Sequence, residues 1–241
     1  MTRSRILSLF ALSALVAACG GGGDGGSPAQ PAPAASTGVP LAAAMSNVIN
    51  QGRSGTVSIA GTVTAAGQTV TVAGSGTYTE STTAATFEGI AGLRKHIDLS
   101  GSVSASGQTA PLSASTDAYY DSNYKPLGST APGTYCVTTA YSGLPASAQA
   151  GTSGAWISQD CYTSSAKTSK IGSGTIGYTV EADSANSAIV RFTTRVTDSA
   201  GNTLPSTASY RVTTTGTTTR LTDVSTFTVS GAAFNLTISY Q

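Results

Sequence analysis

The chain has 241 residues, of which only 10% are charged, and its twelve Lys and Arg against eleven Asp and Glu give a net charge of +1. Soluble domains usually carry about 25% charged residues, and so balanced a charge excludes the basic surface that binds nucleic acids or anionic membranes. Ser, Thr, Gly and Ala fill the difference, a composition that favours an exported all-β protein.

The first nineteen residues have the pattern of an export signal. Arg3 and Arg5 precede thirteen uncharged residues, Ile6 to Ala18, a run too short to span a bilayer as a permanent helix. Small residues end this run, and Cys19 follows them directly in the sequence VAAC. This order of charge, apolar run, small residues and cysteine resembles the lipobox of bacterial lipoproteins.

The lipobox resemblance implies cleavage before Cys19, so that residues 1–18 are a signal peptide and Cys19 carries the lipid. A diacylglycerol on its sulfur and a further acyl chain, such as palmitate, on its amine would hold the protein firmly to a membrane. Gly20 stands where lipoproteins of the inner membrane carry Asp, which implies the outer membrane of a Gram-negative cell envelope. The alternative is an ordinary signal peptide, which would leave a reactive free thiol on an exported protein.

Residues 19–40 predict a flexible tether, because they contain seven Gly and four Pro and almost no side chain to bury. A single β-rich domain is expected over residues 41–241. Loss of Arg3 and Arg5 with the signal would leave ten basic groups against eleven acidic ones.

A short amphipathic helix is expected at the start of this domain. Leu41, Met45, Val48 and Ile49 recur at helical spacing, and the pattern ends near Gly52. We expect the helix to pack on the β domain as a plug or lid.

From Gly55 onward, apolar side chains recur at every second residue, which predicts half-buried antiparallel strands. In one such stretch Val190, Phe192 and Val196 share a face while Arg191 and Arg195 take the other. Further stretches of this kind are Val57 to Val63, Val70 to Tyr78, Ile97 to Val103, Tyr135 to Tyr141, Ile176 to Val180 and Phe234 to Tyr240.

A recurring turn pattern joins these stretches. Ala or Ser, then Gly, then Gln or Asn, then Thr occurs from Ala66, from Ser106 and from Ala200, and glycine there supplies the positive φ of a tight hairpin. The fold predicted is all-β, an antiparallel meander of about ten strands, either a curved half-barrel or a two-sheet sandwich. The alternating C-terminus resembles the last strand of a transmembrane barrel, but Gln241 follows the final aromatic and only 7% of residues are aromatic.

The two remaining cysteines, Cys136 and Cys161, are expected to form a disulfide in an oxidising compartment. Closing this loop of 26 residues would stabilise the fold by roughly 3 kcal/mol. A redox or metal role is the alternative, but the cysteines lack C-x-x-C spacing and His96 is the only histidine. No metal or cofactor is therefore expected.

His96 is also the only imidazole available for catalysis. A Ser-His-Asp triad with Asp98 would need a hydrogen bond that two residues at i and i+2 of a strand are too extended to make routinely. The chain has no G-x-S-x-G nucleophile motif. We therefore expect no enzyme, and place Arg94, Lys95 and His96 on the solvent face of a strand whose other face carries Ile97 and Leu99.

Aromatic residues gather between positions 119 and 162, where six of the ten Tyr and the only Trp occur with both cysteines. Irregular connections are expected in this stretch. One interpretation is a contact surface for a protein or glycan, with Tyr120, Tyr124 and Trp156 exposed. The other, which we favour, is a small satellite core held by the disulfide.

The leading hypothesis is a lipoprotein, anchored in the outer membrane through Cys19, that presents a β domain for binding or envelope structure. The alternative is a periplasmic carrier of an acyl or lipid ligand in a curved sheet, with residues 41–51 as lid. A hydrolase is a third and weaker hypothesis. A cavity lined by residues such as Val57, Ile59, Val72 and Leu99 would favour the carrier, and a filled core would favour display.

Overall fold

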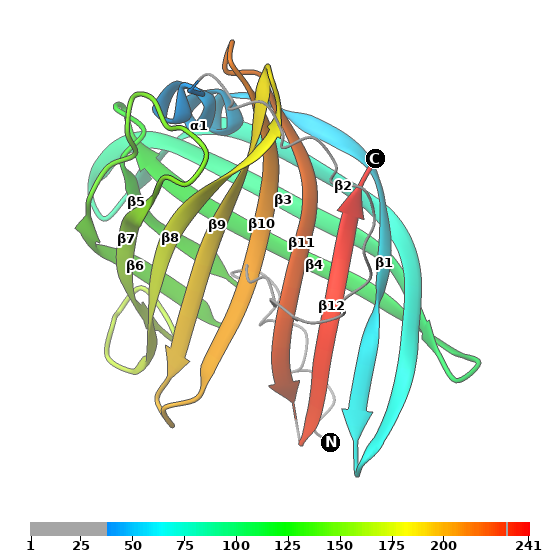
Figure 1. Ribbon diagram of the computed structural model, residues 1–241. Coiled ribbons are helices and arrows are strands. Elements are labelled where there is room, and N and C mark those ends of the chain that lie inside the picture. Colours follow the sequence, from blue (N-terminus) through cyan, green and yellow to red (C-terminus); the bar gives the residue numbers. More distant parts are fainter. Residues whose placement is uncertain (1–37, 230) are drawn as a thin grey trace.

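A computed structural model describes residues 38–229 and 231–241 as one helix and twelve antiparallel strands (Figure 1). Cys19, the predicted signal peptide and nearly all of the predicted tether lie outside the described residues. The elements are α1 (Leu41–Asn50), β1 (Arg53–Ala65), β2 (Gln68–Phe87), β3 (Ile90–Ala105), β4 (Gln108–Asp121), β5 (Pro126–Ala131), β6 (Thr134–Tyr141), β7 (Ser153–Tyr162), β8 (Lys170–Ser184), β9 (Ser187–Asp198), β10 (Thr203–Thr213), β11 (Thr218–Val229) and β12 (Ala232–Tyr240).

The twelve strands close into a barrel in sequence order, because β1 pairs with β2 on one side and with β12 on the other. Val57 lies opposite Tyr240, and Ile59 lies opposite Ile238. The all-β, antiparallel class was predicted correctly, but the half-barrel, the sandwich and the count of about ten strands were wrong. Closure joins the two ends of the domain, and it leaves neither β1 nor β12 as an unpaired edge.

The alternation seen in the sequence becomes an inside and an outside of the barrel. In β1 the inward Val57 and Ile59 are buried, whereas the outward Thr56 and Ser58 are exposed. In β9 the inward Val190 and Phe192 are buried, and the two arginines of that strand face outward, as expected. Hydroxyl-bearing side chains therefore cover much of the outer wall, while apolar ones face the interior.

Two of the three recurring turns are two-residue hairpins. Ala66 and Gly67 have φ of 49° and 75°, and Ser106 and Gly107 have the same two values. Positive φ at both central residues is the signature of the type I′ turn, whose twist matches that of paired strands. The third copy differs, since Gly201 alone has a positive φ there (85°) and the connection from β9 to β10 is longer.

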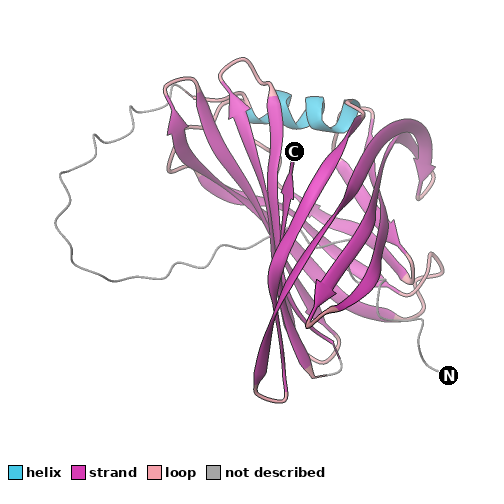
Figure 2. Cartoon of the chain, turned by 90° about the vertical axis from the view of Figure 1, so that its right-hand side faces the viewer, coloured by secondary structure: helices cyan, strands magenta, loops and turns pink. Residues whose placement is uncertain are grey.

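Helix α1 lies across one end of the barrel, as Figure 2 shows, in agreement with the predicted lid. Leu41 and Ala44 are 1% exposed, and they belong to a core cluster with Trp156, Val190 and Phe192 on the barrel wall. In the part of the chain that the structure describes, no helix is both long and apolar enough to cross a membrane.

The stretch from 119 to 162 is more regular than its sequence suggested. It contains the end of β4 and all of β5, β6 and β7. The aromatic side chains there belong to barrel strands and their turns, so Trp156 packs in the core cluster under α1 and not in a separate satellite core.

Candidate binding cavity

The barrel is hollow beneath α1. A cavity of about 270 Å³ lies in its interior, large against the 10–15 Å³ that one water needs and close to the lower limit for small-molecule sites. Its lining is mostly apolar and includes Ile97, Leu99, Ile176, Leu236 and Ile238. Of the four residues named as an indicator of a carrier, only Leu99 lines the cavity. Val57 and Ile59 belong instead to a filled core cluster with Tyr78 and Leu112, and Val72 is buried outside the lining, so this indicator is met only in part.

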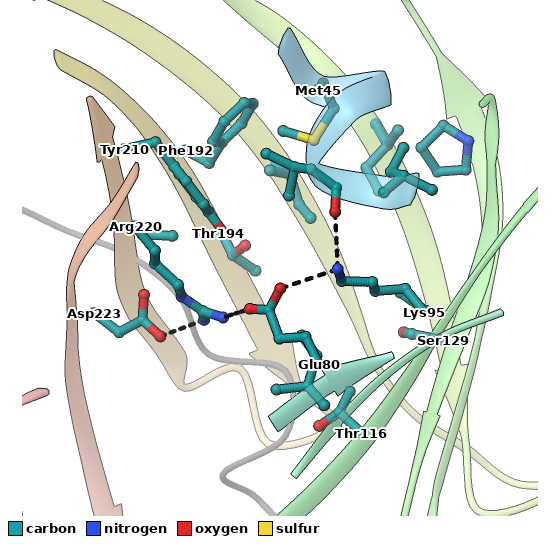
Figure 3. A pocket seen from close by; sticks show the side chains of 18 of the residues that line it. Met45, Glu80, Lys95, Thr116, Ser129, Phe192, Thr194, Tyr210, Arg220 and Asp223 are labelled. Atoms are coloured by element: carbon teal, nitrogen blue, oxygen red, sulfur yellow. Dashed lines mark hydrogen bonds and ion pairs between the residues drawn. The ribbon is translucent and has the colours of Figure 1, made fainter. Parts of the chain in front are cut away.

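Four charged side chains face this interior and form a buried ion-pair network (Figure 3). Lys95 Nζ lies 3.0 Å from Glu80 Oε2, Arg220 Nη1 lies 2.7 Å from Glu80 Oε1, and Arg220 Nη2 lies 2.6 Å from Asp223 Oδ2. None of the four side chains is more than 9% exposed. Burial at this depth requires charges to be paired, and here two cations meet two anions.

Aromatic hydroxyls and rings complete the network. The Tyr240 hydroxyl donates a hydrogen bond of 2.6 Å to Asp223, and the Arg220 guanidinium lies 4.3 Å from the centre of the Tyr240 ring. Burial raises the pKa of Tyr210 to about 12, so this cavity-lining phenol stays neutral. Burial alone would raise the pKa of Glu80, but the charges of Arg220 and Lys95 hold it below its ordinary value.

The network also fastens the lid. Lys95 Nζ donates to the carbonyl of Val48 at 2.8 Å and to that of Gln51, and the Thr82 hydroxyl donates to the carbonyl of Ile49 at 2.5 Å. These carbonyls belong to the C-terminal end of α1, where a cation is favoured by the helix dipole and by unpaired acceptors. Helix α1 has no basic residue of its own in that turn. Lys95 from β3 therefore supplies the cap.

Lys95 is consequently a correction to the sequence analysis. It was placed on the solvent face with Arg94 and His96, but it is 4% exposed and shares the inner face with Ile97 and Leu99. The alternation of β3 leaves no other choice, because Lys95 stands two residues before Ile97. Its burial is possible because Glu80 balances its charge at 3.0 Å and two carbonyls at the end of α1 accept its hydrogen bonds.

The three aromatic residues proposed as a contact surface lie elsewhere than on an exposed end. Trp156 is 7% exposed and, with Tyr120, lines the cavity. Tyr124 is half-buried in the turn between β4 and β5, where its hydroxyl accepts a 2.7 Å hydrogen bond from the Asn50 side chain of α1. These three rings therefore do not form an exposed contact surface on the outside of the barrel.

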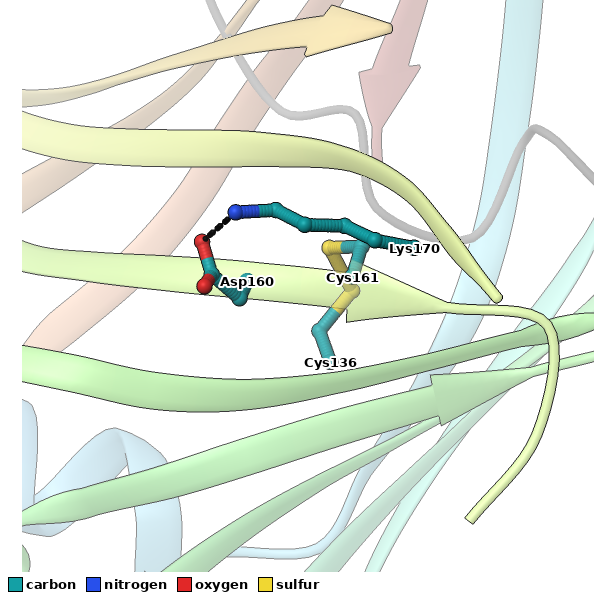
Figure 4. The surroundings of a disulfide bond; sticks show 4 residues. All are labelled: Cys136, Asp160, Cys161 and Lys170. Carbon is teal, nitrogen blue, oxygen red and sulfur yellow. Dashed lines mark ion pairs between the residues drawn. A yellow bond between two sulfur atoms is a disulfide. The ribbon is translucent and has the colours of Figure 1, made fainter. Parts of the chain in front are cut away.

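Cys136 and Cys161 form the expected disulfide (Figure 4). They are register partners on the neighbouring strands β6 and β7, and both are buried, at 0% and 3% exposure. The bridge therefore ties together two strands of the cavity wall.

His96 lies on the outer wall, away from the cavity lining. Its Nδ1 is 2.7 Å from Asp117 and its Nε2 is 2.8 Å from Asp98, so the expectation that Asp98 would be out of reach was wrong. The hydrogen bond with Asp117 raises the pKa of His96 although partial burial opposes it. Both imidazole nitrogens are occupied by carboxylates, which is not the arrangement of a serine–histidine base. No group of three or more metal-binding side chains occurs within residues 38–229 and 231–241.

Comparison with protein-family models, with curated proteins and with solved structures returned no match. A function for this chain therefore has to be inferred from the geometry of its own cavity.

Proposed function

We propose that this protein binds a small, largely apolar molecule inside its barrel and carries or stores it in the cell envelope, anchored through Cys19. The observation that supports this is the cavity itself. Apolar side chains line most of it, and burying a ligand's apolar surface contributes about 25 cal/mol per Å². A display domain has no need of a hollow interior, since a packed core is the more stable arrangement.

Helix α1 is the part of the barrel that a ligand would have to pass to enter or leave the cavity. Helix α1 is held by Lys95, by Thr82 and by the Asn47 side chain, which donates to the carbonyl of Gly216. These few polar contacts and the packing of Leu41 and Ala44 hold α1 over the end of the barrel. They would have to break for a ligand to enter or leave. Short amphipathic segments of this kind can open at much lower cost than global unfolding.

The experiment is uptake of N-phenyl-1-naphthylamine, a neutral dye that fluoresces in apolar sites, together with native mass spectrometry of protein from its own host. Ala114→Phe places a ring in the cavity and should abolish dye uptake, at a stability cost of about 1–3 kcal/mol. Ala73→Phe on the exposed outer wall of β2 is the matched control and should leave uptake unchanged. Equal uptake by both variants would contradict an interior site.

Anchoring is tested separately. Cys19→Ser should prevent incorporation of labelled palmitate and leave an uncleaved or soluble protein, because the acyl chains that provide the binding energy are not added. Labelling that survives this substitution would refute the lipoprotein proposal without affecting the cavity proposal.

A second candidate function, display of the outer wall, is favoured by one specific cluster. Phe87, which is only 5% exposed, stacks on the half-buried rings of Tyr119 and Tyr135, with ring centres 4.4 and 5.1 Å away. Beside it, Ile90 is 47% exposed. Aromatic groups of this kind bind glycans or proteins. Purified peptidoglycan should then retain the wild type but not Tyr119→Ser, and equal retention would dismiss this candidate.

A further inference from the structure

Three uncharged polar side chains of the cavity lining have hydrogen-bonding atoms with no partner among the described residues. They are the Ser129 hydroxyl of β5, the Thr138 hydroxyl of β6 and the Gln159 amide nitrogen of β7. Ser129 is 8% exposed and Gln159 is 3% exposed. An unpaired buried polar group is destabilising, so three of them in one wall need an explanation.

The three side chains form one group, here called the polar patch. Thr138 lies directly opposite Gln159 in the pairing of β6 with β7, and Ser129 lies opposite Cys136, two residues before Thr138. Side chains that are direct or diagonal cross-strand neighbours lie roughly 5–8 Å apart. Thr138 is such a neighbour of both other side chains, whereas Ser129 and Gln159 are separated by β6, so a single functional group of a ligand can bind Thr138 together with one of them.

The chemistry of the polar patch is neutral. An amide nitrogen donates two protons, and each hydroxyl can donate or accept, so together they suit a carbonyl oxygen with a neighbouring donor. They carry no charge to balance an anion.

The nearest cations are not free to supply that charge. Lys95 is bound to Glu80 and to two carbonyls of α1, and Arg220 is bound to Glu80 and Asp223. Three atoms of the network have no hydrogen-bond partner among the described residues: Glu80 Oε2, which is still ion-paired with Lys95 at 3.0 Å, and Arg220 Nε and Asp223 Oδ1, which are one donor and one acceptor and favour neither sign of charge.

We infer that the ligand is a neutral amphipathic molecule whose carbonyl-containing group, an amide or ester, binds the polar patch while its hydrocarbon part fills the apolar cavity. The inference rests on the proposed function, since it assigns a chemical class to the occupant of the same cavity. The volume of about 270 Å³ is roughly twenty times the 10–15 Å³ that one water needs, which leaves room for a hydrocarbon chain of medium length. A free fatty acid is disfavoured, because its carboxylate would be buried without a counter-ion.

The test compares two ligands of the same shape, decanamide and decanoate, at pH 8, where the acid is ionised. Each displaces N-phenyl-1-naphthylamine from the chain carrying Cys19→Ser, a substitution outside the described residues that removes the predicted site of lipid attachment. Decanamide should displace the dye at a concentration at least about tenfold lower than decanoate. Gln159→Leu should weaken decanamide about three- to tenfold when its affinity is expressed relative to that of the dye in the same variant.

Stability controls separate this role from a structural one. Gln159→Leu and Thr138→Val replace unpaired groups by apolar ones of similar size, so their urea midpoints should not fall. Thr138→Val should also weaken decanamide, whereas Thr175→Val on the exposed face of β8 should not.

If the dye binds but decanoate competes as well as decanamide, or Gln159→Leu leaves decanamide unaffected, the neutral-ligand inference is overturned and the cavity proposal stands. If the wild type takes up no dye at all, the proposed function fails and the inference fails with it.

Discussion

Glu80→Gln is the most informative single change in this protein. The substitution keeps the size of the side chain and removes one charge from the buried ion-pair network. Glu80 bridges Lys95 at 3.0 Å and Arg220 at 2.7 Å, and its side chain is 2% exposed. Two cations would then share the single anion Asp223, so one buried positive charge would lose its counter-ion.

Removing one partner of a buried ion pair costs about 3–5 kcal/mol, because the charge left behind has no solvent. That is a large part of the 5–15 kcal/mol that domains usually have. We expect Glu80→Gln to lower the free energy of unfolding by about this amount. The loss should include loosening of α1, since Lys95 caps that helix through the carbonyls of Val48 and Gln51.

Urea titration followed by circular dichroism and by Trp156 fluorescence measures the effect. Glu181→Gln is the matched control, because Glu181 pairs with Arg191 at a similar 2.7 Å but both side chains are partly exposed, at 48% and 31%. Exposed pairs contribute about 0–1 kcal/mol. A loss below about 1 kcal/mol for Glu80→Gln, or equal losses for both variants, would refute the reasoning from burial.

The same residue fixes the sign of the acid response. The pKa of Glu80 is lower in the folded protein than its reference value of 4.5, so its ionised form contributes stability that is fully present above about pH 4.5. This contribution is lost as the pH falls from 4.5 through the folded-state pKa. The urea midpoint of Glu80→Gln should therefore change less with pH in this acid range than that of the wild type.

Three further predictions concern other parts of the barrel. Replacing Cys136 and Cys161 by Ala should lower the free energy of unfolding by about 2–4 kcal/mol, and the native protein should show no free thiol before reduction. Trp156→Ala should cost about 3–5 kcal/mol in a urea melt, as a core residue would; a cost near zero would return it to a contact surface. The raised pKa of His96 contributes stability below its reference pKa of 6.5 that is lost as pH rises through the folded value. His96→Gln should remove this dependence of the free energy of unfolding on pH. The contribution removed should be less than about 1 kcal/mol, because the His96 side chain is 30% exposed.

Local features of the fold were predictable because each depends on neighbouring residues. The helix from Leu41 was expected to end near Gly52 and ends at Asn50, and the alternation in β9 separates Phe192 from its arginines as expected. The turn at Ala66 follows from a glycine that tolerates positive φ. Closure was not predictable, since pairing Val57 with Tyr240 joins opposite ends of the domain and leaves no local signal.

The ion-pair network was overlooked although part of its signal was present. Glu80 stands two residues after Tyr78, and Lys95 two residues before Ile97, so each charge occupies the apolar face of its strand. At Arg220 this signal, a charge on the apolar face of its strand, is interrupted by a β-bulge between β10 and β11. Tyr210 lies opposite Arg220 while Ser209 lies opposite Thr222, so one residue of β11 is skipped and the alternation changes phase. In β6 the alternation gave no guide, since the small Cys136 points inward and Tyr135 packs outside on Phe87.

The cavity and the buried charges are two features of the barrel interior that do not serve stability. An empty volume in a core costs on the order of 24 cal/mol per Å³, which for 270 Å³ is roughly 6 kcal/mol. Buried ion pairs such as that of Glu80 with Lys95 rarely stabilise a fold more than apolar side chains would. Neither feature is explained by stability, but both suit a site that excludes anions, accepts a neutral ligand, and ties the lid to the wall of the same cavity.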